Sequence, residues 1–117
     1  MKRISQVDHK AYYDDPIALM AGEEFVYSGR GDAWDDNPKH IWLWAIAQDG
    51  REGWVPEGFA LVKAGRTIAP HEYFARELNV VVNETLKIIR EANGWAWCKN
   101  SKGQTGWIPL KVFDSST

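Results

Sequence analysis

The residues that could carry covalent or metal chemistry are few in this chain. It has one cysteine, Cys98, and three histidines, His9, His40 and His71. The histidines lack the spacing of a metal site, and a single cysteine cannot complete a zinc motif. The sequence contains no Gly-rich phosphate loop, no His-Glu-x-x-His pattern and no nucleophile elbow. We therefore expect no catalytic residue, no cofactor and no metal, and we predict that the protein is not an enzyme.

Aromatic side chains offer the chemistry of recognition instead. The 117 residues include seven Trp, four Tyr and four Phe, which is more aromatic surface than a small core needs. Aromatic rings concentrate in interfaces and shallow binding sites, where an apolar body and a polar edge are both used. The composition therefore favours binding over catalysis.

The aromatic residues recur because the chain repeats itself. The run Trp42-Leu43-Trp44 is echoed by Trp95-Ala96-Trp97, and Gly53-Trp54-Val55-Pro56 by Gly106-Trp107-Ile108-Pro109, both at an offset of 53 residues. Upstream the offset is 61, so the first copy carries an insertion of eight residues. Cys98 matches Ala45, a small residue, so we expect its thiol to be buried and inert.

Short strands joined by turns are the elements that must position these residues. Alternation and turn residues predict all-β structure without a helix. The expected strands are Ile17–Ala21, Glu24–Ser28, Trp42–Gln48, Gly53–Val55, Ala60–Val62, Leu78–Val82, Thr85–Arg90, Trp95–Lys99, Gly106–Ile108 and Val112–Asp114. We predict two small barrels in tandem, packed against each other: residues 1–64, with an extended acidic loop at 28–40, and residues 65–117.

Composition places the protein among soluble globular chains. Hydrophobic residues make up 44% and charged residues 26%, and the formal charge is −2. The longest apolar run, residues 41–47, is too short to span a bilayer, and the polar start does not resemble a signal peptide. A lone cysteine favours a reducing compartment. We expect a cytoplasmic protein with no membrane partner.

Each copy resembles a Src-homology-3 (SH3) domain, in the short variant common in bacteria. The second copy has Ala69-Pro70-His71-Glu72-Tyr73 where the family has Ala-Leu-Tyr-Asp-Tyr, and Gly94-Trp95-Ala96-Trp97 where it has Gly-Trp-Trp. Gly106-Trp107-Ile108-Pro109 matches the Gly-Leu-Phe-Pro run, as Gly53-Trp54-Val55-Pro56 does in the first copy. The resemblance implies a non-enzymatic module that binds extended, proline-containing peptides in an aromatic groove.

The resemblance also implies which residues line the groove. In the first copy they are Tyr12, Trp42, Pro56 and Phe59. The second copy keeps less of the groove: Tyr73, Trp95 and Pro109 match, while His71 replaces the first Tyr of the family motif and Val112 replaces the last aromatic residue. The sequence therefore predicts that the first copy is the one that binds.

The distribution of charge also favours the first copy as the one that binds a ligand. Residues 1–64 hold seven Lys and Arg against eleven Asp and Glu, whereas residues 65–117 hold seven against five. Beside the predicted groove we expect an acidic rim that attracts a basic peptide. The rim and its aromatic neighbour are Asp14, Asp15, Trp34, Asp35 and Asp36.

Two other readings stay open. The protein could be an accessory or regulatory subunit whose aromatic faces are permanently buried against a larger protein. The second copy could bind single-stranded nucleic acid through its basic residues near Trp95 and Trp97. These basic residues are Arg66, Arg76, Arg90, Lys99 and Lys102. Because the second copy carries a net charge of only +2, we do not expect nucleic acid as a partner.

Overall fold

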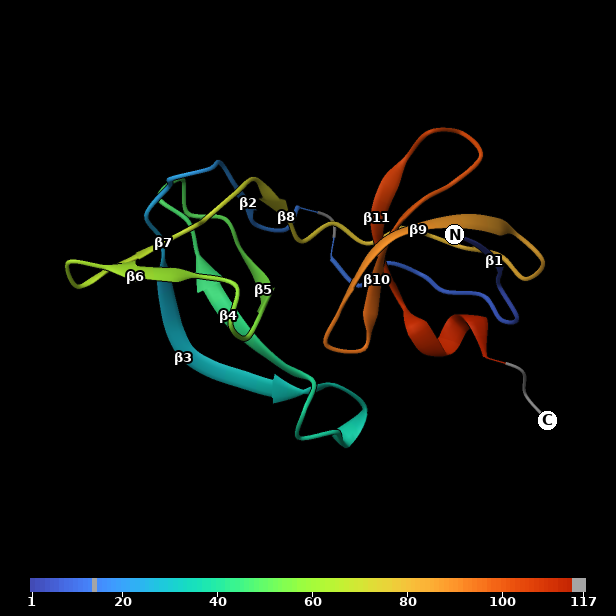
Figure 1. The fold of residues 1–117 in the computed structure, drawn as a ribbon, viewed down its shortest axis with the longest axis horizontal. Coiled ribbons are helices and arrows are strands. Elements are labelled where there is room, and N and C mark those ends of the chain that lie inside the picture. The colour runs from blue at the N-terminus through green and yellow to red at the C-terminus, as the bar shows by residue number, and fades with distance from the viewer. Residues whose placement is uncertain (14, 115–117) are drawn as a thin grey trace. The chain divides into compact units, whose positions relative to one another are not determined.

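The computed structural model describes residues 1–13 and 15–114 and is built from β-strands (Figure 1). No α-helix occurs among these residues, so the predicted all-β class is confirmed. No sheet in the described ranges closes into a barrel, and the tandem-barrel arrangement stays a prediction. The strands are β1 (Lys2–Ile4), β2 (Ala18–Leu19), β3 (Val26–Ala33), β4 (Ile41–Ile46), β5 (Glu52–Pro56), β6 (Leu61–Lys63), β7 (Arg66–Ile68), β8 (Tyr73–Phe74), β9 (Thr85–Ala92), β10 (Trp95–Lys99) and β11 (Thr105–Pro109). Two 3-10 segments are η1 (Trp34–Asp36) and η2 (Leu110–Phe113).

The chain forms two compact units. Residues 15–75 form one, here called the central unit, and residues 1–14 with 76–117 form the other, the terminal unit. The boundary expected from the repeat, between residues 64 and 65, falls inside the central unit. The division into 1–64 and 65–117 stays a prediction about the repeat and does not describe these units.

The central unit is organised around the antiparallel sheet β3-β4-β5. β3 continues through Ala33, so it includes the Gly- and Asp-rich residues 28–33 that begin the predicted loop. A register shift between Tyr27 and Gly31 accommodates this irregular stretch. The connection from β3 to β4 is therefore η1 and residues 37–40 only.

The segment expected to link the two repeats is a tight hairpin in the central unit. β6 pairs with β7, and the two residues between them, Ala64 and Gly65, have φ of 51° and 77°. Two positive φ angles are the mark of a type I′ turn, which suits the twist of a two-residue hairpin. After β7 the chain continues to β8, which pairs with β2. Residues 66–75, the start of the second repeat, thus complete the central unit.

The terminal unit contains the sheet β1-β9-β10-β11. β1, which the sequence analysis did not anticipate, pairs with β9, and His9 bridges Val80 a few residues later. The start of the first repeat therefore completes a unit that is otherwise made of the second repeat. The opening segment of the first repeat, residues 1–14, therefore belongs to the unit that the second repeat forms. The opening segment of the second repeat, residues 65–75, belongs to the unit that the first repeat forms.

The core of the terminal unit follows from the two-residue period of its strands. Leu86 and Ile88 of β9 and Cys98 of β10 face inward and are buried. Burial, and secondarily the charge of Glu91, raises the pKa of the Cys98 thiol to about 12. The expected strand Val112–Asp114 is wrong: η2 covers this position, and Val112 contributes to the core.

Candidate functional site

The structure divides each predicted groove between the two units. Trp42, Pro56 and Phe59 lie in the central unit, whereas Tyr12, expected beside them, belongs to the terminal unit. The reverse holds for the second set, because Tyr73 lies in the central unit while its expected partners belong to the terminal unit; those partners are Trp95 and Pro109. Each predicted groove is divided in this way because the opening segment of each repeat belongs to the unit formed by the other repeat. The predicted rim residue Asp14 lies outside the described residues.

Trp42 and Pro56 stand directly opposite each other on β4 and β5. Both are buried, and Trp42 exposes 7% of its surface. The chain turns sharply after Pro56: the Phe59 N–H donates to the Pro56 carbonyl over 3.0 Å, and Gly58 takes a φ of 89°. The Glu57 N–H donates to the Ile41 carbonyl over 3.0 Å, which fixes this turn beside the start of β4.

Phe59 is the half-buried member of an aromatic cluster. Its ring centroid lies 4.9 Å from that of Tyr73, 5.2 Å from that of His71 and 6.4 Å from that of Phe25. Tyr73 is buried, and its hydroxyl donates to the Trp54 carbonyl over 2.6 Å. Tyr73 therefore anchors the cluster from inside. The contact between Phe59 and residues 71–73 was not predicted from the sequence, because the repeat places them in different barrels.

Acidic side chains surround the start of β4. The Trp34 N–H donates to the His40 carbonyl over 2.8 Å and closes the loop that carries the exposed Asp35 and Asp36. Asp32 pairs with Trp42 across β3 and β4. On the other side stands the exposed Glu57, which the sequence analysis missed.

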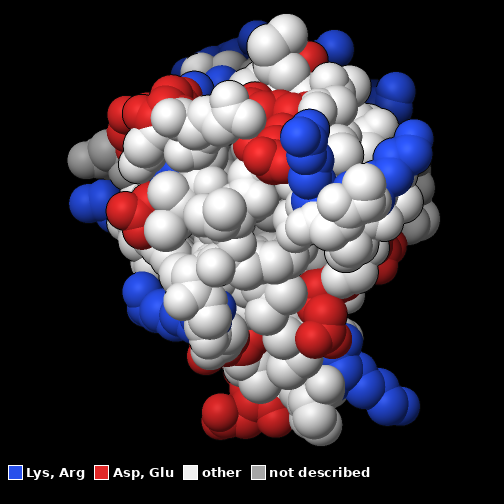
Figure 2. All heavy atoms as spheres, turned by 90° about the vertical axis from the view of Figure 1, so that its left-hand side faces the viewer, with Lys and Arg blue, Asp and Glu red and all other residues white. Residues whose placement is uncertain are grey.

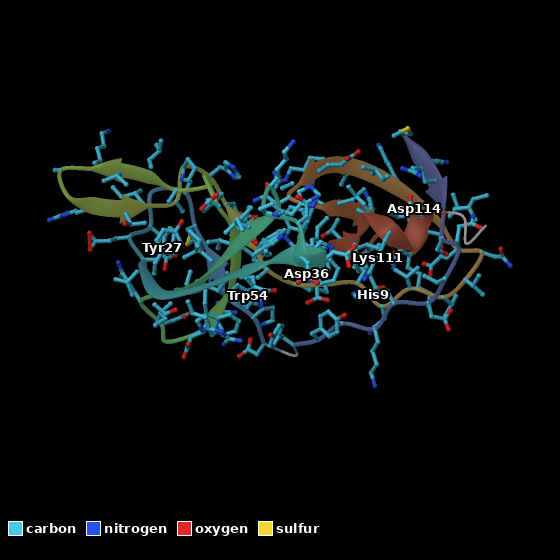
Figure 3. The ribbon with its side chains drawn as sticks, turned by 90° about the horizontal axis from the view of Figure 1, so that it is seen from below. His9, Tyr27, Asp36, Trp54, Lys111 and Asp114 are labelled. Carbon is cyan, nitrogen blue, oxygen red and sulfur yellow. The ribbon has the colours of Figure 1, made fainter. Side chains whose placement is uncertain are left out.

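The charge of Glu57 also affects the pKa of a tyrosine of β3. Burial raises the pKa of the Tyr27 hydroxyl, and the negative charge of Glu57 raises it further. Tyr27 is labelled in Figure 3. The predicted rim residue Asp15 lies elsewhere in the unit. Its carboxylate is 3.6 Å from Arg51, which precedes β5 and so stands at the opposite end of that strand from Pro56.

The terminal unit has a corresponding aromatic arrangement. Trp95 of β10 stands opposite Pro109 of β11. The His9 ring lies 5.7 Å from that of Trp95 and 5.6 Å from that of Tyr12, which is 63% exposed. His9, labelled in Figure 3, also contacts Glu77 over 2.9 Å, with both side chains more than nine-tenths buried. His9 and Glu77 are site neighbours that sequence reasoning missed, since they are 68 residues apart.

The main sheet of each unit also carries a tryptophan pair covered by an arginine. The Arg30 guanidinium lies 5.1 Å from the ring centroids of Trp44 and Trp54. Arg90 lies 5.9 Å from the corresponding centroids in the terminal unit, those of Trp97 and Trp107. Trp107 is buried and Trp54 is partly buried. Each guanidinium is thus placed for cation–π contact with the tryptophan pair of its own unit.

Metal and membrane features complete the description. Over residues 1–13 and 15–114, no group of three or more His, Cys, Asp or Glu side chains is placed to hold a metal ion. The same residues contain no helix of sufficient length and apolarity to cross a membrane.

Comparison with known proteins identifies one family. Residues 62–113 match the family model described as the variant SH3 domain. A search of curated proteins and a search of solved structures each give no match. A variant SH3 domain is therefore found at residues 62–113, a range that covers most of the second repeat. SH3-like domains are modules that bind peptides or proteins rather than enzymes, which agrees with the function predicted from the sequence.

Proposed function

We propose that this chain is a non-enzymatic binding protein whose central unit holds an extended, basic, proline-containing segment of another protein. The arrangement of residues around the start of β4 supports this proposal best. There the opposed pair Trp42 and Pro56 lies between the Phe59 turn and an acidic loop.

The aromatic residues suit a segment in the polyproline II conformation. Such a segment is preformed, loses little entropy on binding and docks its rings against aromatic side chains. Trp42 and Pro56 are buried and would form the floor of the site. The half-buried Phe59 and Trp34 offer the accessible aromatic surface on either side of it.

The charge of the central unit suits a basic ligand. Residues 15–75 contain five Lys and Arg against ten Asp and Glu, a formal charge of −5. Exposed carboxylates stand on both sides of the start of β4, with Asp36 on the loop and Glu57 on the turn. Such an arrangement accelerates encounter with a positively charged segment and orients it.

Charge removal at the rim tests the proposal without disturbing the core. In Asp36→Asn/Glu57→Gln both residues are exposed, and asparagine tolerates the positive φ of 56° at position 36. The matched control is Asp15→Asn/Asp49→Asn, which removes two exposed carboxylates beside Arg51, at the end of β5 opposite Pro56. The probe is a fluorescent 12-residue peptide with two prolines spaced by two residues and flanked by arginines.

Fluorescence anisotropy at low salt then gives the affinity of each variant for this peptide. At about 0.5 kcal/mol for each exposed ion pair, the rim variant should bind about fivefold more weakly than the wild type. The control should bind like the wild type, and a peptide with glutamate in place of arginine should not bind. Equal weakening in both variants, or equal binding of the acidic peptide, would contradict a specific acidic rim.

A permanent protein partner is a second candidate, favoured by exposed apolar residues of the central unit. Leu61 and Val62 on β6 are 55% and 76% exposed, and Met20 is 72% exposed. Figure 2 looks onto the side that carries β6 and β7, where uncharged side chains cover much of the middle. This candidate predicts that the isolated protein self-associates and that Leu61→Thr/Val62→Thr abolishes the self-association. A monomeric wild type at high concentration would exclude it.

A further inference from the structure

A row of lysines crosses the sheet of the terminal unit. Lys2 on β1 pairs with Lys87 on β9, and Lys87 pairs with Lys99 on β10. The row ends at Thr105 on β11, which is the partner of Lys99. Directly opposed residues project from the same face of a sheet, so the three ammonium groups share one face.

That face points away from the core. Cys98, next to Lys99 along β10, is buried, as are Leu86 and Ile88 on either side of Lys87. The side-chain period of two therefore turns all three lysines outward, and all three are exposed.

The lysine row is not required by the fold. Like charges directly opposite each other on a sheet are destabilising. Lys2, Lys87 and Lys99 form no ion pair within the described residues. The corresponding row of the central unit has no lysine: Val26 pairs with Ile46, and Ile46 with Glu52. A neutral or mixed row thus serves the same architecture, which points to a use for the positive charges.

An aromatic platform lies beside the row on the same face. Trp97 is two residues before Lys99 on β10, a separation of about 7 Å along a strand. Trp97 pairs with Arg90 on one side and with Trp107 on the other. The exposed Arg90 guanidinium covers both indole rings, so the platform presents a planar cation supported from beneath by aromatic rings.

An additional arginine extends the positive charge at the β11 end of the row. The Arg76 guanidinium donates to the carbonyl and to the hydroxyl of Thr105, each over 3.0 Å. Arg76, Gln104 and Thr105 border a polar hollow at this end. The terminal unit as a whole has nine Lys and Arg against six Asp and Glu, a formal charge of +3 in a chain whose total is −2.

We propose that this face of the terminal unit binds single-stranded nucleic acid, with phosphates along the lysine row and bases stacked on the Arg90–Trp97 platform. Positive charge that follows a backbone, together with planar groups for base stacking, is the arrangement that single strands require. An anionic membrane or an acidic protein would use the charges but not the platform. The site lies in the other unit from the proposed peptide site, so the two proposals stand or fall separately.

Fluorescence anisotropy with a labelled 20-nucleotide oligo-dT, titrated with the intact protein at several salt concentrations, tests the proposal. The variant Lys87→Gln/Lys99→Gln removes two charges from the row. The matched control, Lys39→Gln/Lys63→Gln, removes two exposed lysines of the central unit and gives the same net charge. A duplex of the same length, anionic vesicles and poly-glutamate serve as comparison ligands.

The expected result is salt-dependent binding of oligo-dT that the row variant weakens and the control does not. Each phosphate contact on a single strand contributes a slope of about 0.7 in log K against log salt, so the row variant should lower the slope by about 1.4. If the wild type and the row variant bind equally at 1 M salt, the variant should bind oligo-dT about 25-fold more weakly than the wild type at 0.1 M salt. A 20-mer of abasic sites should bind several-fold more weakly than oligo-dT, because it lacks bases to stack.

Four results would overturn the proposal. They are no binding of oligo-dT at low salt, equal weakening by the row and control variants, equal affinity for the abasic strand, and preference for duplex, vesicles or poly-glutamate over oligo-dT.

Discussion

Replacing Ser5 with alanine should destabilise the terminal unit, although Ser5 lies at the far N-terminal end of the chain. Ser5 is fully buried. Its hydroxyl donates to the Val81 carbonyl over 2.6 Å and accepts the Glu84 N–H over 2.9 Å. Its backbone N–H and carbonyl also bond to residues 83–84. The residue thus joins the opening segment to a loop more than 75 positions away in sequence.

The magnitude follows from what the missing hydroxyl leaves behind. A buried polar group without a partner costs about 1–3 kcal/mol. The Glu84 N–H keeps a long contact of 3.3 Å with the Val81 carbonyl, which offsets part of the loss. We expect a net destabilisation of about 2 kcal/mol, equivalent to about a 30-fold rise in the population of the open terminal unit.

Hydrogen exchange followed by mass spectrometry measures this effect in each unit separately. In Ser5→Ala, amides of β9–β11 that exchange by unfolding of the terminal unit should exchange about 30-fold faster, while those of β3–β5 should be unchanged. Ser28→Ala, which removes an exposed hydroxyl that accepts the Arg30 N–H, is the control and should change neither. Faster exchange in β3–β5 with β9–β11 unchanged would refute the exchange of opening segments.

Two further predictions concern packing and titration in the terminal unit. Gly106→Ala places a methyl group 2.8 Å from the Leu78 Cγ and 2.9 Å from the Leu78 backbone nitrogen, so urea unfolding should report a loss of about 1–3 kcal/mol; an unchanged midpoint would contradict this close packing. Because the pKa of Cys98 is raised in the folded protein from 9.0 to about 12, its contribution to stability is complete below pH 9 and is lost between pH 9 and 12, by about 1.4 kcal/mol per pH unit. Cys98→Ala should remove this part of the alkaline dependence of unfolding, and an identical dependence in both proteins would contradict it.

The local structure of the chain could be predicted because its signals are local. Alternation in residues 85–90 and the repeated Gly-Trp-x-Pro run indicate strands, and β9 and β11 occur there. The small residue at the position matching Cys98 predicted a buried thiol, which the structure confirms. These features depend on side-chain period and size, which the sequence displays directly.

Pairing between distant segments could not be predicted in the same way. The repeat shows which segments are equivalent but not whether an opening segment pairs within its own copy or with the other. Tyr12 and Tyr73 occupy equivalent positions in the two repeats, so the repeat alone does not determine which unit each one joins. The prediction placed each tyrosine with its own copy, which needs the shorter connection. β1 was missed because a three-residue strand has too few residues to show alternation.

The residues of the candidate sites were predicted where they are close in sequence and missed where distant segments pair. The aromatic neighbours Trp42, Pro56 and Phe59 stay together because β4, β5 and the following turn are consecutive in sequence. Glu57 was missed although it lies between two predicted site residues, because a turn carboxylate has no motif. The lysine row was also missed, since cross-strand register brings together residues 2, 87 and 99.

The most direct test of the central claim is a titration of ¹⁵N-labelled wild-type protein with the arginine-flanked proline peptide, followed by two-dimensional NMR. Our account predicts saturable shifts of the backbone amides of residues 34–42 and 57–59 and of the Trp34 and Trp42 indole N–H groups, with β9–β11 unchanged. Shifts confined to the terminal unit, or none at millimolar peptide, would contradict a peptide site at the start of β4.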